Sequence, residues 1–176
     1  LERGPELKER KELLNIQDSR LAGRLDTSRL GVYGMSFGGA TVAPTCLIDE
    51  RCQAGLNMDG FQFGDLPTGL LEKPYMLMYS EATNGASDFI FERTTNAAYR
   101  IVISGANHMD FCDFTLISPL FKWVGFLGPI KGPRMSEVTS AYTLAFFDQH
   151  LKGKNAQLLN GDSADFPEVS IEAINP

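Results

Sequence analysis

Histidine, cysteine and tryptophan are scarce in this sequence of 176 residues, which contains two, three and one of them. Basic residues are fewer than acidic ones, 16 against 22, and the net charge of −6 argues against nucleic acid as a partner. The cysteines show neither C-x-x-C spacing nor a neighbouring histidine cluster, so we expect no metal site. No apolar run is long enough to cross a bilayer. What remains is an acidic chain with 43% hydrophobic residues, enough to bury the core of one domain.

The start of the chain, Leu1–Pro5, has no signal-peptide pattern and no initiator methionine. We therefore expect the chain to be part of something longer. Cys46 and Cys52 can form a disulfide if a helix ends between them, but an odd number of cysteines says little about compartment. Our expectation for the location is the extracellular space or the periplasm.

One stretch organises the rest of the sequence. Leu30–Tyr33 has the pattern of a buried strand and runs directly into Gly34-Met35-Ser36-Phe37-Gly38, after which small residues open a helix. Strand, G-x-S-x-G and helix in this order are typical of a nucleophile elbow, in which the serine stands on a sharp turn with its Oγ exposed. We expect both outer glycines to be required, because a Cβ two residues either side of the serine would clash with the neighbouring strand or helix.

Segments typical of strands and of helices alternate along the chain. This alternation predicts an α/β fold with a parallel sheet of about four strands. Pro44 is expected to kink or shorten the elbow helix. The predicted strands are 30–33, 54–58, 75–79 and 99–103; the predicted helices are 5–16, 37–47, 88–98 and one that Ser136 caps and Gly153 ends, followed by a polar tail with one short extended segment.

A serine hydroxyl becomes an effective nucleophile when a histidine takes its proton and a carboxylate orients that histidine. After an elbow of this kind the expected order along the chain is serine, acid, histidine. His108 follows the strand 99–103 in a glycine-containing loop, where a base at the carboxyl edge of the sheet belongs. His150 lies near the end of a helix, and we interpret it as a partly exposed structural residue. His108 is therefore the candidate base for Ser36.

Two aspartates compete for the role of the acid. Asp59 comes directly after the second predicted strand, so its position at the sheet edge is well fixed. Asp88 follows the next strand and loop, but it also fits the N-cap of the helix that comes after it. Asp110 and Asp113 are too close to His108 in sequence to orient its ring comfortably. We favour Asp59 and keep Asp88 as the alternative.

Three segments, read together, carry a resemblance to a known family. They are Gly34–Thr41, Ala54–Asp59 and Gly105–Phe114, and the chain resembles the plasma-type platelet-activating factor acetylhydrolase family over roughly 25–151. The His-x-x-Phe-x-Asp-Phe pattern of the third segment is far more specific than the elbow alone. Met35, where members often carry histidine, and Pro44 depart from the family pattern. The family is related to dienelactone hydrolases and implies the α/β-hydrolase fold.

The resemblance also implies roles for particular residues. Ser36 would be the nucleophile, Asp59 the acid and His108 the base, and the backbone N–H of Phe37 would be one oxyanion donor. The family has several strands before the elbow strand, and a loop there supplies a second donor. We therefore expect residues 1–176 to be the C-terminal portion of a single domain that lacks the N-terminal strands, with a core over 25–152 and a tail over 153–176. Because half of the sheet and one oxyanion donor are then absent, we do not expect the isolated chain to be an active monomer.

An open sheet edge and an apolar segment point to partners. The expected partner at the edge is the missing N-terminal half or a second copy of the chain. In the resembling family the region after the histidine helps to contact lipid surfaces, and packing on the core is the competing interpretation. The candidate lipid contacts in this chain are Leu120, Phe121, Trp123 and Phe126.

The leading interpretation is a serine esterase that cleaves short or oxidised acyl chains from phospholipid-like esters through an acyl-enzyme, with no metal or organic cofactor. A broad-specificity carboxylesterase of the dienelactone hydrolase kind, or a polyester hydrolase, is an alternative with the same chemistry. An alternative from another class is a non-catalytic fragment or interaction module that uses the open sheet edge.

Overall fold

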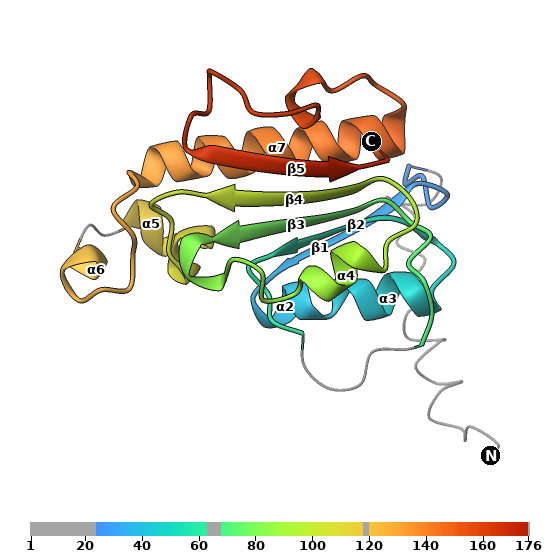
Figure 1. Ribbon diagram of the computed structural model, residues 1–176, viewed down its shortest axis with the longest axis horizontal. Helices are drawn as coiled ribbons and strands as arrows, with labels where there is room; N and C mark the ends of the chain where they lie inside the picture. Colours follow the sequence, from blue (N-terminus) through green and yellow to red (C-terminus); the bar gives the residue numbers. More distant parts are fainter. Residues whose placement is uncertain (1–23, 63–67, 118–119, 176) are drawn as a thin grey trace, which may run out of the picture.

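The computed structural model describes residues 24–62, 68–117 and 120–175, so the predicted helix over 5–16 lies outside the described residues. Within them the chain forms a five-stranded sheet in the order β1-β2-β3-β4-β5, with helices on both faces (Figure 1). The strands are β1 Leu30–Met35, β2 Cys52–Met58, β3 Tyr75–Ser80, β4 Ala98–Ile103 and β5 Val169–Ile174. The helices are α2 Phe37–Ala40, α3 Val42–Ile48, α4 Asp88–Glu92, α5 Phe114–Ile117, α6 Leu120–Trp123 and α7 Gly132–Lys152, with short 3-10 helices η1 Glu81–Thr83, η2 His108–Phe111 and η3 Gln157–Leu159.

Strands β1 to β4 run parallel in chain order, and β5 returns antiparallel beside β4. β3 is buried along its whole length, because its alternate side chains face helices on opposite sides of the sheet. Met76 and Met78 join one apolar cluster, and Tyr75, Leu77 and Tyr79 join the other. Burial on both faces explains why this strand is a continuous apolar run in the sequence. The parallel direction brings the carboxyl ends of four strands to one edge of the sheet.

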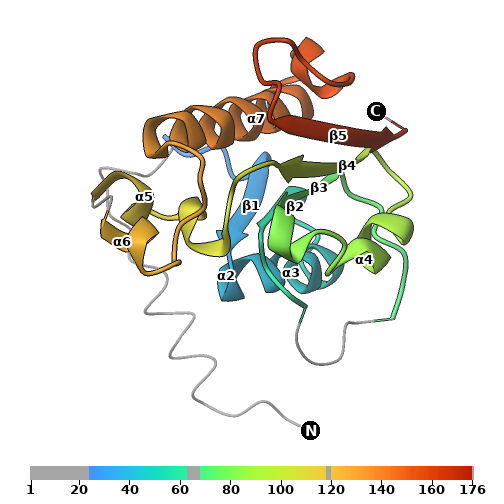
Figure 2. The same cartoon turned by 60° about the vertical axis from the view of Figure 1, so that its left-hand side comes forward.

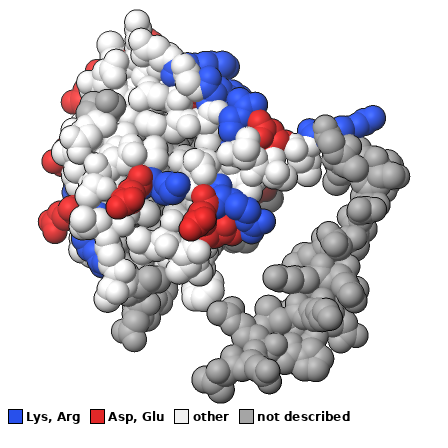
Figure 3. All heavy atoms as spheres, turned by 90° about the vertical axis from the view of Figure 1, so that its right-hand side faces the viewer, with Lys and Arg blue, Asp and Glu red and all other residues white. Residues whose placement is uncertain are grey.

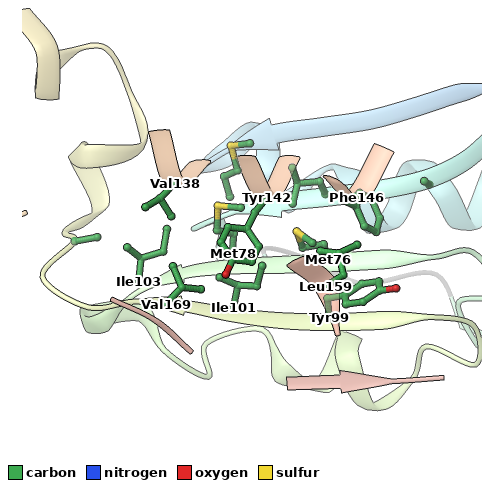
Figure 4. Packing of buried hydrophobic residues seen from close by; sticks show 14 of the residues in the cluster. Met76, Met78, Tyr99, Ile101, Ile103, Val138, Tyr142, Phe146, Leu159 and Val169 are labelled. Atoms are coloured by element: carbon green, nitrogen blue, oxygen red, sulfur yellow. The ribbon is translucent and has the colours of Figure 1, made fainter. Parts of the chain in front are cut away.

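Helix α7 covers one face of the sheet. Val138, Tyr142 and Phe146 recur at helical spacing along it and are fully buried. Figure 4 shows these side chains directed toward those of the strands, among them Met78 of β3 and Ile101 of β4. Burying an apolar side chain of this size stabilises the fold by about 1.5–3 kcal/mol. This helix and the sheet therefore hold the core on which the site is built.

The opposite face is covered by α2, α3 and α4 (Figures 1 and 2). The sequence predicts one elbow helix over 37–47, whereas the structure has two short helices that meet at Thr41. Pro44 explains the break, because it has no N–H and its ring conflicts with the carbonyl four residues earlier; it is accommodated in the first turn of α3. That helix ends between Cys46 and Cys52, and the two cysteines form the disulfide that the sequence allows.

The helix expected over 88–98 is shorter in the structure and ends at Glu92. The backbone that follows pairs with another segment instead of continuing the helix. Leu71 donates its N–H to Arg93 O at 3.0 Å, and Thr95 donates its N–H to Leu71 O at 3.0 Å. This bridge extends the parallel pairing beyond the strands and draws the chain directly into β4.

The last third of the chain differs from the prediction in where its long helix begins and in the place of its tail in the sheet. The long helix begins at Gly132, with Pro133 in its first turn, so Ser136 lies inside the helix and is not its cap. Its end is confirmed, since Gly153 is the left-handed C-cap with φ 66°. The extended segment expected in the tail is the strand Val169–Ile174, which joins the sheet and raises the number of strands from the expected four to five.

β1 lies at an open edge of the sheet in the described part of the chain, as expected, and pairs there with β2 alone. It is less buried than the other parallel strands, and the side chain of Tyr33 is 65% exposed. A hollow lined by Tyr33, Leu144 and Phe147, among others, runs between β1 and α7. The unpaired side of β1 therefore combines backbone hydrogen-bonding groups with apolar surface.

Charged side chains of both signs gather at the end of the molecule where the parallel strands begin. Figure 3 looks at that end and shows basic and acidic groups beside one another. Each ion pair there is at least partly exposed, so solvent screens it and it adds little to the stability of the fold. The pairs include Arg29–Asp26, Arg51–Asp49 and Lys152–Asp148.

Candidate active site

Ser36 stands on the turn between β1 and α2 with φ 56° and ψ −120°, a strained backbone conformation for a residue with a side chain. Its N–H donates to Met58 O at 2.9 Å, which ties the turn to β2. Gly34 is required as predicted, because an added Cβ would lie 2.4 Å from the backbone of Gly38. At Gly38 itself the prediction is wrong, since no atom of the described residues lies within 4 Å of a Cβ placed there.

Asp59 follows β2 at the same edge of the sheet and also has a positive φ of 55°. The buried side chain of Asn57 builds this turn: its oxygen accepts from the N–H of Gly60 at 2.8 Å, and its nitrogen donates to Gly60 O at 3.0 Å. Asp59 N–H donates to Met78 O at 2.8 Å, so the turn is held against β3. Sequence reasoning missed Asn57, although an amide inside an otherwise apolar strand is a visible signal.

His108 begins η2, directly after the loop that follows β4. Asn107 and Asp110 cap this turn reciprocally, with His108 N–H donating to Asn107 Oδ1 at 2.9 Å and Asn107 N–H donating to Asp110 Oδ2 at 2.8 Å. The buried Asp110 carboxylate also accepts from Gly128 N–H at 2.6 Å and from the Thr115 hydroxyl at 2.9 Å. Asp110, set aside as an acid, thus holds the loop that carries the histidine.

The three side chains meet at the carboxyl edge of the sheet. His108 Nε2 lies 2.9 Å from Ser36 Oγ, and His108 Nδ1 lies 2.7 Å from Asp59 Oδ2. Asp59 is only 2% exposed and its carboxylate can only accept, so Nδ1 carries the ring proton and Nε2 is left to accept from the Ser36 hydroxyl. In this arrangement a histidine can take the proton of a serine as the serine attacks an acyl carbon.

Two hydroxyl residues after β3 surround the same carboxylate. Ser80 donates its N–H to Asp59 Oδ1 at 2.6 Å and its hydroxyl to Asp59 Oδ2 at 3.1 Å, and the Thr83 hydroxyl donates to Oδ1. Both residues are buried. The sequence analysis missed them, because a stretch of small polar residues after a strand is typical of any exposed loop.

Asp88, the alternative acid, binds elsewhere. Arg100 Nε donates to both of its carboxylate oxygens at 3.0 Å. Asp88 is the first residue of α4, and Ser87 is the N-cap in its place. Of the two candidate acids, Asp59 lies beside His108, whereas Asp88 forms an ion pair with Arg100 of β4.

His150 has a structural environment. It packs against Phe146, with ring centroids 4.9 Å apart, and its Nε2 lies 3.1 Å from the hydroxyl of Tyr99. Burial lowers the pKa of His150, because a half-buried imidazolium lacks part of the hydration that would stabilise its charge. Its surroundings match the interpretation of a structural residue at the end of a helix.

The apolar segment after the histidine stands out from the sheet at the edge where the parallel strands end, as α5 and α6 show in Figures 1 and 2. The side chain of Trp123 is 88% exposed, and those of Leu120 and Phe126 are exposed as well. Phe121 is half-buried against Phe114, with ring centroids 5.0 Å apart. None of the described helices is long and apolar enough to cross a membrane.

No group of three or more histidine, cysteine or acidic side chains in residues 24–62, 68–117 and 120–175 is placed to hold a metal ion. The polar groups that converge at the site are a hydroxyl, an imidazole and a carboxylate in one hydrogen-bonded series. Such a series suits nucleophilic attack and proton transfer by the side chains themselves.

Comparison with known proteins gives consistent relatives. The family model for platelet-activating factor acetylhydrolase, isoform II, matches residues 9–165. A platelet-activating factor acetylhydrolase from Cavia porcellus is 31% identical over 174 residues, covering 90% of this chain and 39% of the relative. A probable 1-alkyl-2-acetylglycerophosphocholine esterase from Arthroderma benhamiae is 31% identical over 165 residues, covering 81% of this chain and 43% of the relative. The chain therefore spans less than half the length of these curated relatives.

A solved structure shows the same architecture. The ferulic acid esterase from Streptomyces cinnamoneus matches with a TM-score of 0.76 and 29% identity, over 96% of this chain and 55% of that one. This likeness, with the mainly parallel sheet and its flanking helices, confirms the predicted α/β-hydrolase fold. Since the family model also matches most of its length, the chain belongs to the platelet-activating factor acetylhydrolase, isoform II, family.

Proposed function

We propose that this chain carries the catalytic serine, histidine and aspartate of a serine esterase. The observation that carries the proposal is the hydrogen-bonded series from Ser36 Oγ through His108, at 2.9 Å and 2.7 Å, to the buried carboxylate of Asp59. The relatives are named as esterases and acetylhydrolases, which supports the same class of reaction.

The first half of the reaction acylates the serine. His108 Nε2 takes the proton of Ser36 as Oγ attacks the ester carbonyl carbon, and Asp59 stabilises the imidazolium that forms. The backbone N–H of Phe37, the first residue of α2, donates to the oxyanion. The bond to the alcohol oxygen then breaks, the alcohol leaves with the proton from His108, and the acyl group remains on Ser36 as an ester.

The second half releases the acyl group. A water molecule gives a proton to His108 Nε2 while its oxygen attacks the acyl carbon, again with the oxyanion held by backbone N–H. Collapse of this intermediate breaks the bond to Ser36 Oγ, which regains the proton, and a carboxylic acid leaves. Every proton and bond is accounted for by side chains, backbone and water, so the scheme uses no metal or organic cofactor.

For the substrate we propose short or oxidised acyl esters of phospholipid-like molecules. The name of the Arthroderma relative, a probable 1-alkyl-2-acetylglycerophosphocholine esterase, supports this class. The exposed apolar side chains of Leu120, Trp123 and Phe126 support contact with a lipid surface near the site, and Phe121 packs against Phe114 in the same segment. A broad carboxylesterase is the alternative, and the ferulic acid esterase neighbour favours it.

The proposal extends to location and partners. The disulfide between Cys46 and Cys52 supports an extracellular or periplasmic location, because such bonds persist in oxidising compartments. The unpaired side of β1 supports pairing with a further part of the protein or with a second copy of the chain. A further part is also where a second oxyanion donor would come from.

Labelling with a fluorophosphonate probe, which reacts with activated serines, tests the reaction class. We expect one label on the parent chain, which for this test includes the strands expected before β1, and none on its Ser36→Ala variant. Ser28→Ala, a matched change at an exposed serine before β1, should label normally. Labelling of Ser36→Ala at the rate of the parent chain would contradict the proposal. Rates on an acetylated phospholipid and on p-nitrophenyl acetate, measured side by side, then separate the two substrate classes, and absence of both labelling and hydrolysis would favour a non-catalytic module.

A further inference from the structure

The turn that follows β3 contacts both the acid and the loop of the base. It consists of Ser80 and η1, Glu81–Thr83. Ser80 and Thr83 both donate to the Asp59 carboxylate, which His108 also contacts. Glu81 reaches the other way, and its Oε2 accepts from the N–H of Gly105 at 3.0 Å, three residues before His108. This short turn therefore contacts both Asp59 and the loop that carries His108.

The Asp59 carboxylate has its acceptor capacity filled. Two oxygens offer about four lone-pair sites. Oδ1 accepts from the Ser80 N–H and the Thr83 hydroxyl, and Oδ2 accepts from the Ser80 hydroxyl and from His108 Nδ1–H. Because a donor occupies every acceptor site, rotation of the carboxylate about the Cβ–Cγ bond of Asp59 would break several hydrogen bonds at once. The plane of the carboxylate, and with it the direction of Oδ2 toward His108, is thereby fixed.

The hydroxyls of Ser80 and Thr83 have more acceptors within reach than they have protons to donate. Ser80 Oγ and Thr83 Oγ1 also lie 3.0 Å from each other, and Thr83 Oγ1 lies 3.4 Å from Ser80 O, so four contacts share two hydroxyl protons. A carboxylate is the stronger acceptor, which directs both protons to Asp59 and leaves the other two contacts without one. Both side chains are buried, so water does not replace either donor readily. The Asp59 carboxylate therefore depends on these two hydroxyls for two of its hydrogen-bond donors.

We propose that Thr83 and Ser80 are positioning residues, which hold the Asp59 carboxylate in the orientation that directs His108 toward Ser36. The inference rests on the proposed function, because it assigns Asp59 the orienting role. Removing one hydroxyl leaves an acceptor site of a buried charge empty, frees the carboxylate to rotate, and lowers the fraction of molecules in which His108 points correctly. A hydrogen bond to a charged group of this kind corresponds to about a 10- to 100-fold effect.

The first test compares rates of labelling of Ser36 by a fluorophosphonate. Thr83→Val keeps the shape and removes the hydroxyl, and we expect it to react about 10- to 100-fold more slowly. Thr83→Ser keeps the hydroxyl and should react within about threefold of the parent chain. Thr94→Val is the matched control, because Thr94 is equally buried and donates to Ile90 O at 2.8 Å in α4. It should lower the melting temperature and leave the labelling rate unchanged. Equal rates for Thr83→Val and Thr94→Val would overturn the proposal.

The second test does not need activity. The proton that His108 Nδ1 shares with Asp59 gives a low-field resonance in the proton NMR spectrum, and Asp59→Asn should abolish it. A carboxylate that is free to rotate holds this proton in poorer geometry, so the resonance should move upfield in Thr83→Val and return in Thr83→Ser. Ser80→Ala, which keeps the backbone donor, should shift it in the same direction if Thr83→Val does not fold. An unchanged resonance in a folded variant would refute the positioning role.

The two tests also separate this inference from the proposed function. If the parent chain is not labelled at all but the resonance responds as described, the positioning role stands and the esterase proposal fails. If the parent chain is labelled and Thr83→Val is labelled equally fast, the esterase proposal stands and the positioning role fails.

Discussion

Replacing Asp59 by asparagine keeps the outline of the side chain and removes its charge and one acceptor. The two donors at Oδ1, from Ser80 and Thr83, require the new amide oxygen on that side. The amide NH₂ then faces His108 Nδ1, which must accept. The ring proton consequently moves to Nε2, where it points at Ser36 Oγ, and the histidine can no longer take the proton of the serine.

The size of the loss follows from this inverted tautomer. In a Ser-His-Asp arrangement the same change lowers turnover by about 10⁴-fold, which is roughly 5.4 kcal/mol of barrier. The assay is the second-order rate of fluorophosphonate labelling, with hydrolysis of p-nitrophenyl acetate beside it. Melting curves for each variant show that the comparison is between folded proteins.

Asp88→Asn is the matched control, since Asp88 was the other candidate acid. It weakens a partly exposed ion pair with Arg100 and should leave labelling within about threefold of the parent chain. The role of Asp59 as the acid would be refuted if Asp59→Asn labels within tenfold of the parent chain, a difference of about 1.4 kcal/mol. It would be refuted equally if Asp88→Asn loses as much as Asp59→Asn.

Two further predictions concern surfaces. Trp123 is the one tryptophan of the sequence, so its fluorescence emission should shift to the blue when phosphatidylcholine vesicles are added. Phe126→Ser should weaken binding to the vesicles, whereas Ile48→Ser, a change at a residue exposed elsewhere on the surface, should not. Emission that vesicles leave unchanged would rule out lipid contact. Size-exclusion chromatography with light scattering should give a mass above 19.4 kDa that rises with concentration, and Tyr33→Lys should lower it, because a charge beside the unpaired strand opposes pairing. A constant monomer mass would contradict self-association.

Strand order and chain direction account for most of what could be predicted. Ser36, Asp59 and His108 each follow a parallel strand, and parallel strands end at the same edge, so their proximity could be inferred from short apolar runs. The distinction between Asp59 and Asp88 rested on the distance of each from its strand end. In the structure Asp59 is fixed by a tight turn and lies within hydrogen-bond distance of His108, whereas Asp88 lies beyond a longer loop and pairs with Arg100.

The features that were missed depend on side-chain direction. Whether a hydroxyl after β3 faces solvent or turns back to a neighbouring strand is decided by the conformation of η1, which composition does not encode. Ser136 is a good cap and so predicts too late a start for α7, which begins at Gly132, where the backbone lies too close to Thr115 for a side chain to fit. β5 is polar on one face, and the alternation in Val169–Ile174 is a signal that a period-of-two search would find.

Four successive strand ends supply the site: Ser36 after β1, Asp59 after β2, Thr83 after β3 and His108 after β4. About two dozen residues separate each from the next, and contacts between distant segments form late in folding because loops must close first. The reactivity of Ser36 therefore reports on a late stage of refolding. It should return only after all four strands have paired, later than the helical signal of α7, so the serine reports on completion of the sheet and not on collapse of the chain.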